Sequence, residues 1–278
     1  MRYNIRIVQF GITPVRTDLL FTTMPKFTLE QIDPLAVQFE HSSPQQIITW
    51  AVENFSPDIA MSSSFQTQSL PLLHMTAGIY PAIKIFFLDT GYHFWDTLIF
   101  REQLAWQYNL NLIDLYRDTS WAVFQRRFGR DLPQHDPNLC CFINKVQPMQ
   151  KALAGLPAWI TGIRRDQTKT RANARILELQ DDGLLKINPL LNWTSKDVEA
   201  YRIANRLPEH PLSSKGYRSI GCAPCTKPVG ANEDERAGRW AGTMKTECGL
   251  HTEMFQQKDI DTGEIQHQFI LHELEIKK

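Results

Sequence analysis

The chain has 278 residues, of which 42% are hydrophobic, 10% aromatic and 22% charged. These fractions are typical of a soluble globular protein and exclude collagen-like, disordered and coiled-coil chains. Lys and Arg number 30 and Asp and Glu number 30, so the chain lacks the basic excess of proteins that bind long nucleic acids along the phosphates. We therefore expect no nucleic-acid partner.

The chain carries no sign of membrane insertion or export. No stretch approaches the roughly 18 consecutive apolar residues of a transmembrane helix, and the N-terminus has neither the apolar run nor the cleavage site of a signal peptide. Five cysteines, an odd number, make a poor disulfide framework. We expect a cytoplasmic protein without a membrane partner, in which the cysteines have a chemical role.

Apolar runs of strand length alternate along the chain with longer helical stretches. The predicted strands are 59–61, 83–88, 110–115, 159–163 and 187–190. The predicted helices are 44–55, 68–77, 93–108 and 194–205. Two helix starts have local signals, namely Ser43 before Pro44, and Thr194 three residues before Asp197.

This alternation predicts an α/β fold with a mostly parallel twisted sheet flanked by helices. Ligands of such sheets bind at the carboxyl ends of the strands. Three segments begin where a predicted strand ends, and we expect them to share one cleft: SSSFQTQS, LDTGYHF and TGIRRDQTKTRAN. Three regions are predicted: a poorly defined extension at 1–28, the α/β domain at 29–215 and a C-terminal segment at 216–278.

Four of the five cysteines form two close pairs. Cys140 and Cys141 are adjacent, and Cys222 and Cys225 form a CxxC motif. Four thiolates suit either a structural zinc ion or a four-iron cluster. Adjacent cysteines reach two corners of one zinc tetrahedron awkwardly, whereas the irons of a cubane cluster lie further apart. We expect a [4Fe–4S] cluster, and zinc or two unrelated pairs of buried thiols are the alternatives.

The fifth cysteine, Cys248, has no partner cysteine and lies in KTECGLH. Lys245 and His251 make its surroundings cationic, which favours the nucleophilic thiolate. Gly249 and the weakly structured surroundings predict a mobile arm. The alternative is an unreactive surface thiol.

An anion site is predicted on two grounds. Hydroxyl and backbone N–H groups of Ser62, Ser63 and Ser64 follow a strand and precede a helix, although such a run is often only a turn. The chain has neither a Walker A motif nor the SGGxDS core of pyrophosphatase-type loops. Guanidinium groups match phosphate and sulfate oxygens, and cationic residues near the supposed cleft are Lys145, Arg164, Arg165, Lys169, Arg171, Arg236 and Arg239.

The chain resembles the assimilatory sulfonucleotide reductases, iron–sulfur branch, which reduce adenylyl sulfate (APS) or its 3′-phosphorylated form (PAPS) to sulfite. The resemblance runs from about Ser42 to His251, in the segments SSSFQTQS, FLDTGYHF, CCFINKVQPM, TGIRRDQTKTRAN, KINPL, GYRSIGCAPC, GRWAG and KTECGLH. It implies an adenine nucleotide alpha-hydrolase-like fold of the PP-loop type with a mobile C-terminal tail.

The resemblance also implies roles for individual residues. Cys140, Cys141, Cys222 and Cys225 would bind the [4Fe–4S] cluster, and Cys248 would be the catalytic nucleophile. The implied substrate-binding residues are Ser62, Ser63, Ser64 and Gln68 of the phosphate loop, Leu88 and Gly162 at the adenosine, and Lys145, Arg171, Arg236, Arg239 and His251 around the anion. The cationic cluster adds Arg164 to this set.

The implied reaction belongs to assimilatory sulfate reduction, which leads to cysteine biosynthesis. Cys248 would attack the sulfur of the sulfate group, expel AMP and become an S-sulfocysteine. Thioredoxin or glutaredoxin would then release sulfite by thiol exchange. A homo-oligomer is compatible with the sequence.

Two features of the resemblance disagree about the substrate. The cluster cysteines are typical of the APS branch, whereas SSSF and INKVQPM resemble the PAPS branch. Asn144 and Gln68 stand where APS reductases often have arginine and aspartate, and no negative residue remains at Gln68 to repel a 3′-phosphate. We expect APS as the substrate; PAPS or dual use is the alternative. A PP-loop tRNA-thiolating ATPase and a non-enzymatic iron–sulfur sensor are remote alternatives.

Overall fold

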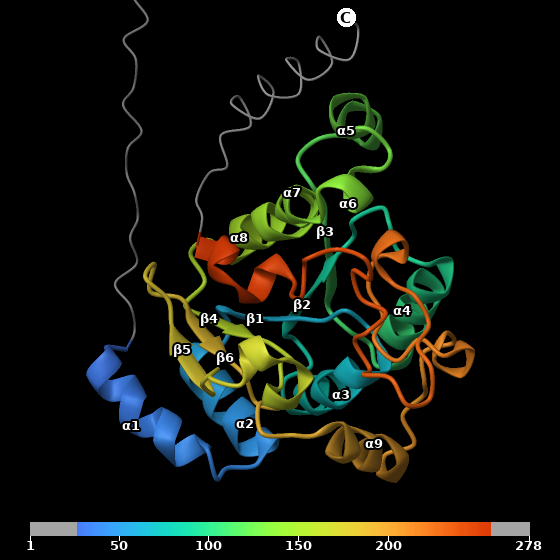
Figure 1. Cartoon of the computed structure of the whole chain (residues 1–278). Coiled ribbons are helices and arrows are strands. Elements are labelled where there is room, and N and C mark those ends of the chain that lie inside the picture. The colour runs from blue at the N-terminus through green and yellow to red at the C-terminus, as the bar shows by residue number, and fades with distance from the viewer. Residues whose placement is uncertain (1–26, 257–278) are drawn as a thin grey trace, which may run out of the picture.

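The computed structural model describes residues 27–256, which form a six-stranded sheet with helices on both faces (Figure 1). The order of the strands is β3-β2-β1-β4-β6-β5, and all neighbours are parallel except β5 and β6. The strands are β1 (Ile59–Ser62), β2 (Lys84–Leu88), β3 (Leu112–Leu115), β4 (Ala158–Ile160), β5 (Leu177–Leu179) and β6 (Leu185–Ile187). The predicted mostly parallel α/β fold is confirmed.

The described α-helices are α1 (Leu29–Phe39), α2 (Pro44–Phe55), α3 (Leu70–Ile79), α4 (Trp95–Gln107), α5 (Trp121–Phe128), α6 (Leu132–His135), α7 (Pro137–Cys141), α8 (Gln147–Leu153) and α9 (Ser195–Ala204). The capping signals act as predicted. Ser43 Oγ accepts a hydrogen bond from the N–H of Gln46, and Thr194 Oγ1 accepts one from the N–H of Asp197. Helices α2 and α9 therefore begin where local side-chain bonding satisfies their free N–H groups.

Several elements differ from the sequence prediction, and helices α5 to α8 lie where no helix was predicted. Helix α1 was not predicted, because Pro34 lies inside it; the box between Thr28 and Gln31 is the signal that identifies it. Strand β5 was not predicted, and β6 lies earlier than the predicted 187–190. Strands of three residues are too short to show a hydrophobic period. The predicted extension at 1–28 lies outside the described residues except for Phe27 and Thr28.

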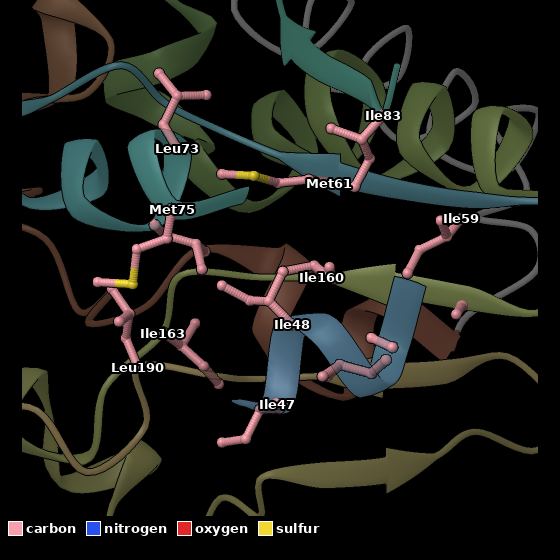
Figure 2. Packing of buried hydrophobic residues seen from close by; sticks show 14 of the residues in the cluster. Ile47, Ile48, Ile59, Met61, Leu73, Met75, Ile83, Ile160, Ile163 and Leu190 are labelled. Atoms are coloured by element: carbon pink, nitrogen blue, oxygen red, sulfur yellow. The ribbon is translucent and has the colours of Figure 1, made fainter. Parts of the chain in front are cut away.

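The two faces of the sheet are buried by different helices. Successive residues of a strand point to opposite faces, so Ile59 and Met61 join the large cluster against α2 and α3, whereas Ala60 faces the cluster that contains Met149 of α8. Figure 2 shows Met61 and Ile160 of neighbouring strands packed with side chains of α2 and α3. Burial on both faces explains why the strands are nearly continuous hydrophobic runs.

Residues 216–256 pack across the carboxyl ends of the parallel strands. The N–H of Ala223 donates to the carbonyl of Tyr92 (2.7 Å), next to an antiparallel bridge between His93 and Cys222. Figure 1 shows the end of this segment, in red, beside α7 and α8. The C-terminal segment therefore covers the edge of the sheet at which ligands of such folds bind. Among residues 27–256, no helix is long and apolar enough to cross a membrane.

Candidate active site

A cleft of about 160 Å³ lies between the carboxyl ends of β1, β2 and β4 and the C-terminal segment. Its lining comes from loops far apart in sequence, as the positions of the polar segments predicted. Of the predicted site residues, the cleft brings together Ser62, Ser63, Ser64, Gln68, Leu88, Lys145, Gly162, Arg171, Arg236, Arg239, Cys248 and His251. These residues form one concave site in the described chain.

The serine loop is held by its own hydrogen bonds. Ser62 Oγ accepts from the indole N–H of the buried Trp159 (3.0 Å), and Ser63 Oγ accepts from the N–H of Phe65 (3.2 Å). Phe65 is buried with φ at 53°, a left-handed conformation in a tight turn. Two of the three hydroxyl groups therefore fix the loop, and Ser64 is exposed at the cleft.

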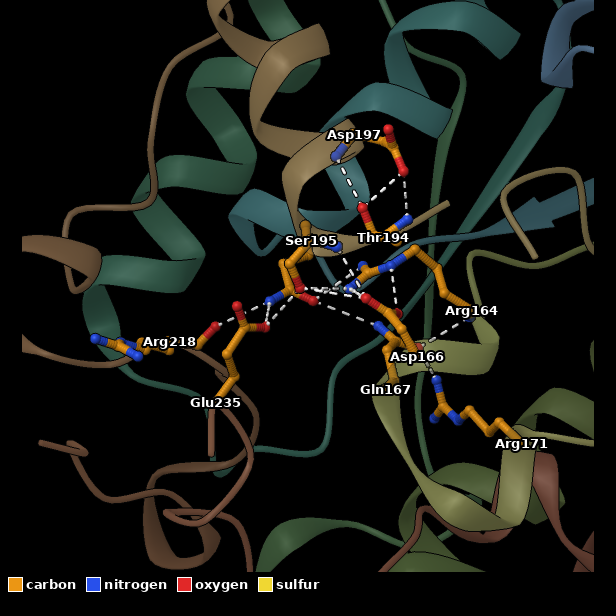
Figure 3. Close-up of polar contacts among 10 residues, drawn as sticks. Arg164, Asp166, Gln167, Arg171, Thr194, Ser195, Asp197, Arg218 and Glu235 are labelled. Atoms are coloured by element: carbon orange, nitrogen blue, oxygen red, sulfur yellow. Dashed lines mark hydrogen bonds and ion pairs between the residues drawn. The ribbon is translucent and has the colours of Figure 1, made fainter. Parts of the chain in front are cut away.

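Arg164 does not line the cleft, in contrast to its predicted role as a substrate-binding residue. Its side chain is fully buried and donates to Asp166 (3.0 Å), to Gln68 Oε1 (3.0 Å) and to Ser195 Oγ (3.1 Å). Figure 3 shows the guanidinium beside Asp166 and Ser195. Arg164 therefore positions the phosphate loop indirectly, through its hydrogen bond to the side chain of Gln68.

A buried carboxylate, Glu247, lies at the centre of the cationic residues. Its side chain forms two hydrogen bonds of 2.7 Å with Arg171, and Arg236 Nη2 donates to it over 3.2 Å. Burial alone would raise the pKa of Glu247, but the hydrogen bonds and positive charge of the arginines outweigh burial and lower it. The sequence analysis missed Glu247; its place beside Cys248 in KTECGLH was the available signal.

Three residues that line the cleft have a buried side-chain nitrogen with no hydrogen-bond partner among the described residues. These atoms are Nε of Arg236, Nε of Arg239 and Nδ1 of His251. Burial lowers the pKa of Arg236 to about 10 and that of His251 well below its ordinary value, so the arginine is charged and the histidine neutral at neutral pH. Unpaired buried polar groups are rare in native proteins, and here they point to a polar ligand.

Cys248 lies in the cleft lining at the end of the C-terminal segment. Its backbone N–H donates to Glu247 Oε1 (2.8 Å), so the ion pair with Arg171 also holds the cysteine backbone. The following Gly249 allows close packing, because a Cβ there would collide with the sulfur of Met254. The arm that was predicted to be mobile is thus packed against the cleft, with Cys248 half-buried.

Lys145 lies in a π-helical turn, Phe142–Val146, directly after the adjacent cysteines. Such turns are frequent at functional sites. Burial lowers the pKa of Lys145, but the sulfur atoms of Cys222, Cys248 and Cys141 outweigh burial and raise it. Lys145 lines both the cleft and a second cavity, so this residue lies between the two sites.

The second, small cavity is lined by all four paired cysteines, Cys140, Cys141, Cys222 and Cys225. The five cysteines of the chain form no disulfide. Burial raises the pKa of Cys140, Cys141 and Cys225, for Cys141 to about 12, and neighbouring sulfurs add to the shift of Cys140 and Cys225. Burial therefore favours the neutral thiols, and four thiolates would form here only with a cationic group between them. Within residues 27–256 no three Cys, His, Asp or Glu side chains converge as ligands of one metal ion.

Comparisons with known proteins establish the family. A model of the phosphoadenosine phosphosulfate reductase domain matches residues 58–228. The chain belongs to the sulfonucleotide reductase family. Curated relatives are the adenosine 5′-phosphosulfate reductases of Rhodococcus opacus (39% identical, covering 78% of this chain and 91% of the relative) and Chelativorans sp. (43% identical, covering 78% and 89%).

Solved structures agree with this assignment. The phosphoadenylyl-sulfate reductase of Candida auris in complex with phosphate is 31% identical, has a TM-score of 0.63, and the match covers 71% of this chain and 96% of that structure. The FMN adenylyltransferase of Candida glabrata (16% identical, TM-score 0.50, covering 87% and 82%) shares only the fold. The chain is therefore an oxidoreductase of a family that acts on a sulfur group.

This sulfonucleotide reductase contains one further cationic residue that the sequence analysis missed. Arg117 donates to Asn144 Oδ1 (2.9 Å) and to the carbonyl of Thr90 (2.9 Å). Its guanidinium also lies over the ring of Trp121, 4.6 Å from the centroid. Asn144 is the position at which the sequence lacked an arginine, and the fold brings one there from another segment.

Proposed function

We propose that this chain reduces a sulfonucleotide to sulfite and AMP, with APS as the preferred substrate, in assimilatory sulfate reduction. The observation that carries this proposal is the single cleft that contains Cys248, Lys145 and the guanidinium groups of Arg171, Arg236 and Arg239. A nucleophile and this much positive charge suit attack on the anionic phosphate–sulfate anhydride of a sulfonucleotide.

The first step is a displacement at sulfur. The Cys248 thiolate attacks the sulfur of the sulfate group, a sulfur–sulfur bond forms, and the bond from that sulfur to the bridging oxygen breaks. AMP leaves with the electron pair, and the enzyme carries an S-sulfocysteine. Arg236 and Arg239, whose Nε–H groups have no partner among residues 27–256, would offset the repulsion between the two anions.

The second step needs a dithiol such as thioredoxin or glutaredoxin. Its thiolate attacks Sγ of Cys248, a mixed disulfide forms and sulfite leaves with the electron pair. The second thiol of the reductant then closes the reductant's own disulfide and returns Cys248 as a thiolate. Because Cys248 is half-buried and the arm that carries it is packed against the cleft, this step requires the arm to open.

The side chains that line the second cavity suit a [4Fe–4S] cluster by their chemistry. Its four cysteines, which lie together at one cavity and form no disulfide, are the donor set that such clusters use. When bound, the cluster would polarise the site next to Lys145. A single structural zinc ion on the same four cysteines is the alternative.

The preference for APS is supported by the relatives. The curated relatives at 39–43% identity are named adenosine 5′-phosphosulfate reductases, whereas the structure named for PAPS is 31% identical. The neutral serine loop is the feature that favours PAPS.

The test uses anaerobically purified protein without a reductant. APS and PAPS are offered separately, and mass spectrometry of the intact chain and its peptides measures the addition of one SO₃ group to Cys248. We expect the adduct with APS, less of it with PAPS, and none with Cys248→Ser. An adduct from PAPS alone would reverse the substrate assignment, and no adduct from either substrate would refute the covalent mechanism.

A further inference from the structure

The amide group of Gln68, in the phosphate loop, is fully used by protein partners. Its Nε2 donates to Glu235 Oε2 (2.5 Å) and to the carbonyl of Arg218 (3.4 Å). Its Oε1 accepts from Arg164 (3.0 Å) and from Gln167 (3.4 Å). Gln68 lines the cleft, yet it has no N–H group free for a ligand anion in this arrangement.

The carboxylate of Glu235 accepts a hydrogen bond from this amide. Glu235 also accepts a hydrogen bond from Ser195 Oγ (3.1 Å), and Figure 3 shows the two side chains together. No described arginine or lysine forms an ion pair with Glu235, so its negative charge is not neutralised by a direct contact within residues 27–256. The Arg164 guanidinium on the other side of the amide is paired with Asp166 (3.0 Å), so among the described residues Glu235 is the carboxylate without an ion pair that lies one hydrogen bond away from the cleft.

The position of Glu235 is fixed by the docking of the C-terminal segment on the same loop. Gln66 Oε1 accepts from the N–H of Ile220 of this segment (3.0 Å), and Thr67 Oγ1 lies 3.0 Å from the Oγ of Ser213, shortly before the segment begins. Three consecutive loop residues, Gln66 to Gln68, thus contact this part of the chain. These contacts fix the position of Glu235 relative to the phosphate loop.

We infer that Glu235, acting on Gln68, is a specificity-determining residue that disfavours nucleotides with an additional phosphate beside this loop, and so favours APS over PAPS. This inference rests on the proposed function. It also revises the expectation that no negative residue remains at Gln68: the carboxylate comes from a residue 167 positions away in the sequence. Two effects act together, since like charges repel and the Gln68 donors are occupied.

The test compares two product-like nucleotides, AMP and adenosine 3′,5′-bisphosphate, by calorimetric titration of the full chain purified anaerobically. Glu235→Gln keeps the size and a hydrogen-bond acceptor but removes the charge. We expect its affinity for the bisphosphate to rise about tenfold relative to that for AMP, and kcat/KM for PAPS relative to APS to rise by a similar factor. Glu233→Gln, at an exposed carboxylate of the same segment, is the matched control and should leave the ratio unchanged.

The other outcomes are equally informative. Glu235→Asp keeps the charge and should retain the wild-type ratio; if it shifts the ratio as much as Glu235→Gln, geometry decides and the inference is overturned. An unchanged ratio in Glu235→Gln, or an equal loss of affinity for both nucleotides, also overturns it while leaving the proposed function intact. If the wild-type chain binds neither nucleotide, the proposed function fails and this inference fails with it.

Discussion

Arg171 and Glu247 form a bidentate ion pair in which both N–O distances are 2.7 Å. The two side chains are buried, with 9% and 3% of their surface exposed, and they are 76 residues apart in the sequence. The pair connects the loop after β4 to the residue that precedes Cys248. One contact therefore positions the nucleophile and also occupies a guanidinium that faces the substrate site.

Glu247→Gln is expected to slow S-sulfonation of Cys248 by roughly 10–100-fold, because the backbone of Cys248 loses its charged anchor and a small displacement of a nucleophile is costly. The rate of SO₃ addition from APS, measured in single-turnover experiments by mass spectrometry, checks this. Glu253→Gln, at an exposed carboxylate of the same arm, is the control. A wild-type rate in Glu247→Gln would show that the pair does not position Cys248.

Gly221→Ala is expected to weaken substrate binding. A Cβ at this position would collide with the guanidinium of Arg239, so that side chain must leave its place over the backbone. We expect KM for the sulfonucleotide to rise about tenfold, the effect of losing one charge-assisted hydrogen bond, with iron content unchanged.

Gly78→Ala is the matched control for this substitution. Gly78 lies in α3, and a Cβ there would have no atom within 4 Å. Removing a helical glycine should leave KM unchanged and stabilise the fold by up to about 1 kcal/mol. Equal KM values for the two alanine variants would contradict the role assigned to Arg239.

Cys222→Ser is expected to lose the iron–sulfur cluster. Anaerobic wild-type protein should contain about four iron and four acid-labile sulfide atoms per chain, measured by colorimetric analysis. Cys248→Ser should keep both, because Cys248 lies outside the cavity of the four paired cysteines. One zinc per chain and no sulfide would favour the structural zinc alternative instead.

His210 is expected to make folding stability depend on pH. It is 1% exposed, accepts from the N–H of Leu212 at Nδ1 (3.1 Å) and lies 2.9 Å from Thr97 Oγ1 through Nε2. Burial lowers its pKa from 6.5 to about 4, so the folded state resists protonation. Its contribution is complete above pH 6.5 and is lost as the pH falls toward 4, by up to about 3 kcal/mol.

Urea unfolding between pH 7.5 and pH 4.5, followed by tryptophan fluorescence, measures this loss. His210→Gln should be less stable at pH 7.5 but should show a smaller decline on acidification. His41→Gln, at an exposed histidine, should behave like the wild-type chain. Parallel declines in all three proteins would assign the pH dependence to other groups.

Local signals predicted much of the fold. The start of α2 follows from Ser43 and Pro44, because capping bonds form within one helical turn. The strands of the parallel sheet are apolar runs that both faces bury, and their order along the chain predicted the cleft at their carboxyl ends. The short β5 and the proline-containing α1 were missed because neither has a clean period.

The sequence by itself determined which residues carry reactive chemistry, because thiols in close pairs and a lone cysteine in a cationic context are visible without a fold. Only the tertiary structure decided how the charges are paired. Glu247 with Arg171, Glu235 with Gln68 and Arg117 with Asn144 each join distant segments. Such contacts have no sequence period, because they arise when packed elements bring together side chains whose buried charges and donors need partners. The reactive residues were therefore predictable from the sequence, whereas their ion-pair and hydrogen-bond partners were not.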